Sequence, residues 1–215
     1  MSEGGARACR VCQSTATEVW RTQVEDYFTR APFDIQRCRA CGLGWTDPQP
    51  AKLSDHYPVS YRRYRGPVGW ALRLLYGRRI RGLVKELGTS GDALEVGCGD
   101  GWMLRALQRH GWRVAGIERT YASAAVAHQH GLPMAVGSLE STLAEPQFDL
   151  VILFHVLEHL DDPVDALRQC AQRLKSKGRL FVAVPNWGGW QARLFGPRWL
   201  HLDVPRHLVH FSPHA

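Results

Sequence analysis

A glycine-rich loop follows a short apolar segment near the middle of the chain and limits what this half can fold into. The segment Ala93–Val96 has the length and composition of a buried strand, and glycines follow at positions 97, 99 and 101. Because glycine has no Cβ, such a loop lets the backbone approach a ligand closely at the amino end of the next helix. The pattern predicts a ligand-binding strand–loop–helix unit.

Strand-like and helix-like segments alternate from this unit to Pro185. Strands are expected at 93–96, 113–117, 134–136, 148–154 and 179–184, and helices at 102–110, 122–130 and 162–174. Alternation of this kind is typical of parallel strands joined by crossover helices. We therefore predict an α/β fold with a doubly wound parallel sheet, whose ligand crevice lies beyond the carboxyl ends of the first strands.

Three residues near the loop indicate what the ligand is. A dinucleotide fingerprint needs a third glycine where Trp102 stands, so the loop favours a smaller adenosine cofactor. Glu118 ends the second strand, where a carboxylate can accept hydrogen bonds from both ribose hydroxyls. Glu95 lies inside the first strand, and a buried carboxylate needs a partner such as a cationic ligand group or a backbone N–H.

Cysteine pairs mark the first fifty residues. Cys9 and Cys12, then Cys38 and Cys41, form two Cys-x-x-Cys pairs separated by 25 residues. Two tight turns of this kind supply a closed tetrahedral shell of sulfur, which predicts a structural zinc site. Iron in the same shell, a redox pair and disulfides are the alternatives. Two further cysteines, at 98 and 170, are expected to be buried as small hydrophobic residues.

Positive charge is concentrated in one segment. The chain carries 27 Lys and Arg against 20 Asp and Glu, a net charge of +7, and residues 62–85 contain eight basic and no acidic residues. The basic residues are Arg62, Arg63, Arg65, Arg73, Arg78, Arg79, Arg81 and Lys85. Apolar residues recur at three- and four-residue steps from Trp70 to Leu87, which predicts an amphipathic helix. We favour a helix packed on the main domain over one that contacts an anionic membrane surface or a phosphate-bearing substrate.

Length and composition set the outline of the molecule. A chain of 215 residues that is 45% hydrophobic is not wholly disordered. No segment approaches the roughly 18 apolar residues of a membrane span, and the first residues lack a signal-peptide pattern, so a cytoplasmic protein is expected. The expected parts are a zinc-binding module at 1–50, a basic helical connector at 51–90 and the α/β domain at 91–215.

Four motifs resemble those of class I S-adenosylmethionine-dependent methyltransferases. They are Leu-Glu-Val-Gly-Cys-Gly-Asp-Gly at 94–101, Gly-Ile-Glu at 116–118, Phe-Asp-Leu-Val at 148–151 and His-Val-Leu-Glu-His at 155–159. The resemblance extends from Gly91 to Pro213 and implies a Rossmann-like sheet with S-adenosylmethionine as cofactor. The N-terminal part resembles a subgroup with a four-cysteine zinc module, whose members often modify sugars or other small metabolites.

The resemblance also implies roles for individual residues. Gly97, Gly99 and Gly101 would surround the methionine part of the cofactor, with Glu95 near its amino group, and Glu118 would hold the ribose. Ser138 and Leu139 match positions that flank the adenine, with an ordinary helix start as the alternative. Phe154 and His155 would line the sulfonium end.

A neutral acceptor must lose a proton, so a base that titrates near neutrality is expected. His155 is the preferred candidate, and His159, His207 and His210 are alternatives. His155, Glu158 and His159 could instead form a metal cluster, although local packing of His159 is the favoured interpretation.

The carboxyl-terminal part of the sequence raises two questions. Aromatic and basic residues after Pro185 predict a substrate-facing lid, with packing of the tryptophans against the parallel sheet as the competing interpretation. The family sheet normally continues beyond the fifth strand, so the chain is expected to be a truncated or shortened member, or to have that open edge covered by a second subunit.

The sequence thus predicts a methyltransferase acting on a small, anionic metabolite. An RNA methyltransferase that uses the zinc module and the basic helix is one alternative. The chain lacks the Asn/Asp-Pro-Pro-aromatic tetrad that amino-methylating nucleic-acid enzymes usually show after the fourth strand, so nucleic acid is the less favoured partner. A catalytically inactive binding protein is the other alternative.

Overall fold

The computed structural model describes residues 8–57, 66–88, 90–139 and 147–215. The chain forms two compact units, each built from separated segments. The first unit contains Met1–Tyr61, Leu157–Val164 and Val184–Ala215, and the second contains Arg62–Val156 and Asp165–Ala183. The linear division into segments 1–50, 51–90 and 91–215 stays a prediction.

The second unit is built around a five-stranded parallel sheet. Its strands are β4 (Asp92–Val96), β5 (Arg113–Glu118), β6 (Met134–Val136), β7 (Phe148–Phe154) and β8 (Leu174–Ala183). Their order is β6-β5-β4-β7-β8, and every pair is parallel. The predicted doubly wound α/β sheet is therefore confirmed, with β4 and β7 where the order reverses.

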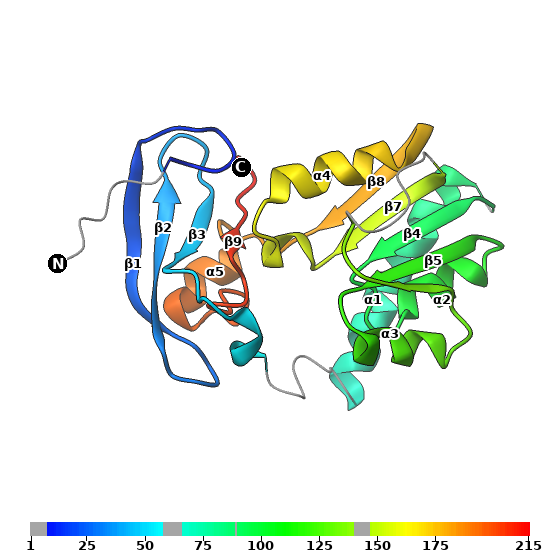
Figure 1. The fold of residues 1–215 in the computed structure, drawn as a ribbon, viewed down its shortest axis with the longest axis horizontal. Helices are drawn as coiled ribbons and strands as arrows, with labels where there is room; N and C mark the ends of the chain where they lie inside the picture. Colours follow the sequence, from blue (N-terminus) through cyan, green and yellow to red (C-terminus); the bar gives the residue numbers. More distant parts are fainter. Residues whose placement is uncertain (1–7, 58–65, 89, 140–146) are drawn as a thin grey trace. The chain divides into compact units, whose positions relative to one another are not determined.

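Helices cover both faces of this sheet. They are α1 (Gly66–Leu87), α2 (Trp102–Gln108), α3 (Tyr121–His128) and α4 (Pro163–Gln172). Right-handed crossovers to opposite ends of the sheet require opposite faces. Figure 1 accordingly shows α4 on one face of the sheet and α2 and α3 on the other.

The core of the second unit follows the apolar segments of the sequence. The side chains of Leu150, Val151, Ile152 and Leu153 in β7 are fully buried. Such a continuous apolar run is typical of a central parallel strand that is covered on both faces. From α1, Ile80 and Val84 join the same core. In the described part of this helix, Arg78, Arg79, Arg81 and Lys85 are exposed, which supports the packed-helix interpretation.

Strand β8 begins five residues before the predicted start at 179. Its first half contains Lys175 and Lys177, so it lacks the apolar pattern of a buried strand. The Lys175 ammonium lies 2.9 Å from Asp92 and 2.7 Å from Asp149, on two neighbouring strands. Ionic contacts with the two neighbouring strands therefore accompany the early start of β8. Apolar periodicity in the sequence does not indicate such contacts.

The first unit contains an antiparallel sheet of four strands. They are β1 (Thr17–Glu25), β2 (Pro32–Cys38), β3 (Gly44–Asp47) and β9 (Val209–His210), in the order β1-β2-β3-β9. Three short 3-10 helices, Leu53–His56, Leu157–His159 and Gly196–Arg198, and helix α5 (Trp190–Phe195) complete the unit. Within the described residues, no helix of either unit combines the length and apolar composition needed to cross a bilayer.

The tail after Pro185 supplies much of the core of this first unit. Trp187 and Trp199 are 8% and 5% exposed and pack with Val24, Phe33 and Ile35 of the antiparallel sheet. For these two tryptophans the predicted lid is wrong, and the sheet on which they pack is the N-terminal antiparallel one, not the parallel sheet of the competing interpretation. Apolar area removed from water decides their position.

A buried ion network fixes the tail to the strands. The Arg206 guanidinium, fully buried, lies 2.7 Å from Asp26 and 2.9 Å from Asp203. It also donates to the carbonyl of His56. Burial favours the neutral form of Asp26, but hydrogen bonds from Arg206, His56 and Thr29 hold the pKa of this carboxyl well below its usual range.

We expect Arg206→Met to destabilise the first unit by about 3–5 kcal/mol, because it leaves two buried carboxylates without their counter-ion. Urea denaturation followed by tryptophan fluorescence measures the change. Arg30→Met is the matched control, since the Arg30–Glu25 pair is exposed and its loss should change stability little. Equal effects of the two substitutions would contradict the assignment.

Candidate functional site

The loop after β4 is shaped by three glycines with left-handed backbone. Gly97, Gly99 and Gly101 have φ values of 67°, 56° and 67°. A Cβ on Gly97 would lie 2.5 Å from Cγ2 of Val156, and one on Gly101 would overlap Leu132. A Cβ on Gly99, in contrast, would meet nothing within 4 Å. The open space of the loop is therefore at Gly99, where a ligand can reach the backbone.

Glu118 lies against the same loop. Its Oε1 accepts a hydrogen bond of 2.6 Å from the backbone N–H of Gly99. The parallel register of β4 and β5 brings the carboxyl ends of the two strands together. Burial raises the pKa of Glu118, while the N–H groups of Gly99 and Arg119 lower it. The predicted ribose-binding carboxylate thus borders the open part of the glycine loop.

Glu95 gives the site an unusual electrostatic character. The residue is 3% exposed, and its burial, followed by the charges of Glu118 and Asp100, raises its pKa well above the ordinary value. The Leu104 N–H donates to this carboxyl, whereas its Oε2 has no hydrogen-bond partner among the described residues. Three carboxyl groups close to one loop suit a ligand that carries positive charge.

Aromatic residues lie at the carboxyl end of β7. The Phe154 ring centroid is 4.7 Å from that of Tyr76 and 6.1 Å from that of Trp102. His155 follows with a φ of 55°, which is uncommon for a residue with a Cβ. Its N–H donates to the carbonyl of Ala183, and its ring lies 4.7 Å from Phe154. The turn therefore holds the imidazole beside Phe154.

Ser138 and Leu139 follow β6 at the same edge of the sheet. Ser138 is exposed, whereas the Leu139 side chain is 6% exposed. The Arg173 guanidinium donates to the carbonyl of Leu139 and anchors this turn. Their assignment to the adenine stays a prediction.

The three alternative bases all belong to the first unit. His159 Nδ1 lies 2.8 Å from the carbonyl of Arg206 and 3.0 Å from the Tyr57 hydroxyl. His207 is buried, and its Nδ1 lies 2.8 Å from the carbonyl of His201. His210 is buried in β9. All three are thus bound into the folded unit.

A group of potential cation ligands appears here that the sequence did not identify. One ligand atom each from Glu158, His159 and His207 lies within 4.8 Å of the others. The sequence grouped His155 with Glu158 and His159 instead. His207 is far from them along the chain, so only the folded tail reveals its place beside the His159 ring, at 4.7 Å.

The four N-terminal cysteines form a second candidate metal centre. Their sulfur atoms all lie within 4.8 Å of one another. The Sγ atoms of Cys9 and Cys41 are 3.6 Å apart, as are those of Cys12 and Cys38. Although burial opposes it, backbone N–H groups of Cys41 and Ala40 and the Cys12 thiol lower the pKa of Cys38 to about 7. The predicted four-cysteine cluster is confirmed.

Comparison with known proteins decides the family. The family described as "Methyltransferase domain" matches residues 69–215, which include the glycine loop, Glu118 and the β7 turn. The chain belongs to the class I S-adenosylmethionine-dependent methyltransferases.

Similar proteins include two named as ubiquinone biosynthesis O-methyltransferases. The one from Alkalilimnicola ehrlichii is 32% identical over 181 residues, which cover 80% of this chain and 64% of that protein. The one from Marinobacter nauticus is 36% identical over 104 residues, 44% of each chain. This methyltransferase therefore spans about half to two thirds of the length of these relatives.

Among solved structures, a similar one is described as a possible histamine N-methyltransferase from Thermotoga maritima. It has a TM-score of 0.51 and 23% identity, and the match covers 67% of this chain and 70% of that one. At this level of identity the likeness supports the methyltransferase fold alone.

His210 gives a testable pH dependence. Thr46 Oγ1 donates to the carbonyl of His207 and lies 3.1 Å from His210 Nε2, so Nε2–H is the donor in that second contact. Burial lowers the pKa of His210 to about 4, against a small opposing effect of Asp203. The unfolded chain therefore binds a proton near pH 6.5 that the folded chain does not.

We expect the free energy of unfolding to be constant above about pH 7 and to fall by roughly 3 kcal/mol between pH 6.5 and 4 on account of this residue. Urea denaturation at a series of pH values measures it. His210→Gln keeps an N–H donor without titrating, and it should flatten this part of the profile. An unchanged profile in the variant would contradict the assignment.

Proposed function

We propose that this methyltransferase transfers the methyl group of S-adenosylmethionine to a small-molecule acceptor. The observation that carries the proposal is the open space at Gly99, bordered by the Glu118 carboxylate at the end of β5. A carboxylate there can accept hydrogen bonds from both hydroxyls of a ribose. Membership of the methyltransferase family supports S-adenosylmethionine as the source of that ribose.

The residues around the loop fit the other parts of the cofactor. Glu95 and its acidic neighbours favour a ligand with an ammonium and a sulfonium group, and Glu95 Oε2 has no hydrogen-bond partner among the described residues. Gly97, Gly99 and Gly101 let the backbone approach the methionine part. Phe154 borders the sulfonium end, and Ser138 and Leu139 flank the adenine.

S-adenosylmethionine, when bound, supplies a methyl group already activated by its positive sulfur. The chain must then align the acceptor and exclude water. Positioning of that kind lowers the activation free energy by roughly 7–11 kcal/mol. We assign the proton-accepting role to His155, because its turn at the end of β7 fixes the imidazole next to Phe154. His159, His207 and His210 all belong to the first unit, and the burial of His207 and His210 argues against these two.

An oxygen atom of a small metabolite is the proposed acceptor. The relatives from Alkalilimnicola ehrlichii and Marinobacter nauticus are named ubiquinone biosynthesis O-methyltransferases. A hydroxyl acceptor also matches the need for a base. We extend only the chemical class, a hydroxyl on a small organic molecule, to this protein.

The four cysteines are proposed to bind Zn²⁺ as a structural centre. Tetrahedral zinc with Zn–S bonds of 2.3 Å places its sulfur ligands about 3.8 Å apart. The measured Sγ–Sγ distances of 3.6 Å come close to this value. Cys9 and Cys38 also belong to a core with Leu43, Trp45 and Val209. A metal here would therefore stabilise the antiparallel sheet and its contact with β9.

We expect Glu118→Ala to raise the Kd for S-adenosylmethionine by about tenfold or more, because it removes charge-assisted hydrogen bonds to the ribose. Isothermal titration calorimetry on the purified chain measures the affinity. Glu86→Ala, an exposed change in α1, is the control and should bind like the unaltered protein.

Two results of this titration would count against the proposal. No binding of S-adenosylmethionine to the unaltered protein would contradict methyl transfer to a small molecule and methyl transfer to RNA alike. It would favour a binding protein without methyltransferase activity. Normal binding by Glu118→Ala would contradict the ribose assignment alone.

We expect the purified protein to contain about one zinc per chain, and Cys38→Ser to contain less than half of that and to unfold more readily. Metal analysis in the presence of reductant measures the content. Cys170→Ala is the matched control, since this thiol is buried in α4 and is not one of the four clustered cysteines. Substoichiometric zinc in the unaltered protein, below about 0.5 per chain, would argue against the site.

A further inference from the structure

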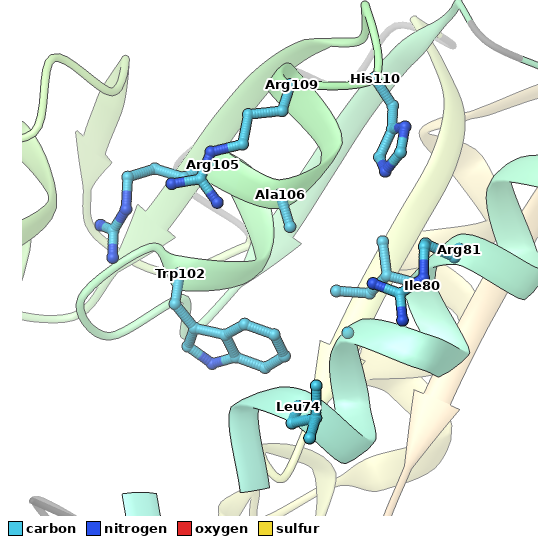
Figure 2. A pocket seen from close by; sticks show the side chains of 9 residues that line it. Leu74, Ile80, Arg81, Trp102, Arg105, Ala106, Arg109 and His110 are labelled. Carbon is cyan, nitrogen blue, oxygen red and sulfur yellow. The ribbon is translucent and has the colours of Figure 1, made fainter. Parts of the chain in front are cut away.

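A cavity of about 370 Å³ lies between helices α1 and α2 of the second unit. Its nine lining residues are Leu74, Gly77, Ile80 and Arg81 of α1 and Trp102, Arg105, Ala106, Arg109 and His110 in and after α2 (Figure 2). The volume is within the range of small-molecule sites. Of these nine residues only Trp102 borders the proposed cofactor site, through its ring contact of 6.1 Å with Phe154.

One side of this cavity is apolar. Figure 2 shows the Trp102 indole and the Ile80 side chain facing the space between the two helices. Ile80 is 5% exposed and belongs to the core, so it forms a fixed wall. Trp102 is half-buried and presents an aromatic face. This side can accept an apolar or aromatic group.

The remaining lining is cationic. Arg81 and His110 bring basic side chains to the space between the helices, whereas Figure 2 shows the Arg105 and Arg109 guanidinium groups on the side of α2 that faces away from α1. Among the described residues that line the cavity there is no carboxylate. Arg105 donates to the carbonyl of Asp100, but Arg81 and Arg109 form no ion pair or side-chain hydrogen bond with another described residue. Because no described carboxylate competes for it, the Arg81 guanidinium can pair with an anion there.

We propose that this cavity binds a phosphate ester with an apolar or aromatic group. The guanidinium fork matches the geometry of phosphate oxygens, while Trp102 and Ile80 receive the apolar part. The ligand is either a soluble organic phosphate or the headgroup region of an anionic lipid, since both have this chemistry. The site does not depend on the proposed methyl transfer, and its test requires no S-adenosylmethionine.

The first test fills the cavity and leaves its charges in place. Gly77 lines the cavity, and a Cβ added there would meet nothing within 4 Å. Gly77→Leu should therefore occupy the space without strain and weaken the binding of octyl phosphate by tenfold or more in calorimetry. Gly82→Leu is the matched control. It lies in the same helix with the same free space, but it does not line the cavity, so it should leave binding unchanged.

The second test removes charge. Arg81→Gln should weaken octyl phosphate by about tenfold, the loss expected for one charge-assisted contact. Arg79→Gln, an exposed change of the same size and charge on the same helix, should have no effect. Inorganic phosphate should bind more weakly than octyl phosphate, because it lacks the group that contacts Trp102.

Vesicles of phosphatidylglycerol distinguish the two sources of the ligand. Vesicle binding that is lost in both Gly77→Leu and Arg81→Gln, and retained in their controls, supports the proposal with a lipid as source. Binding of soluble octyl phosphate with the same dependence supports it with a soluble phosphate. The proposal would be overturned if neither vesicles nor octyl phosphate bind, or if the test and control variants lose binding equally.

Discussion

Parallel pairing of β4 with β5 and β7 is the constraint on which the proposed active site depends. The register sets Glu95 beside Gly116 on one side and beside Ile152 on the other. All three strands therefore end at the same edge of the sheet, where the glycine loop, Glu118 and the β7 turn meet. Backbone hydrogen bonds, rather than contacts among the polar side chains, bring these residues together.

Charge has a different function in each unit. In the second unit, carboxyl groups lie close to the open glycine loop, where a cationic ligand is proposed, while Arg81 and His110 line the separate cavity proposed for an anion. In the first unit, Arg206 and its two aspartates neutralise one another out of contact with water. The first two arrangements leave charge available for ligands, and the third uses it to hold a tail in place.

The sequence predicted the parallel sheet well because its signal is local. Four of the five strands were expected within one residue at each end, since Leu150–Leu153 and similar segments are apolar without interruption. The cysteine spacing likewise predicted the cluster. The sequence also predicted the glycine loop and Glu118, which the structure brings together.

The missed features depend on contacts between distant segments. The start of β8 was not predicted, because Lys175 and Lys177 interrupt its apolar pattern. The two residues of β9 are too few to show the alternation of a strand. The burial of Trp187, the Arg206 network and the place of His207 follow from the return of the tail to the first sheet. No local pattern specifies which segments will meet.

The pairing of β3 with β9 has a consequence for folding during synthesis. Thr46 and His210 are in contact although they are 164 positions apart along the chain, so the antiparallel sheet stays incomplete until residue 210 has left the ribosome. The cysteine turns and the parallel strands, by contrast, need only partners synthesised before that point. Long-range contacts of this kind form slowly, because a large loop must close first. Until then Val24, Phe33 and Ile35 lack the tail residues that cover them in the folded unit, so apolar surface of β1 and β2 is exposed to aggregation.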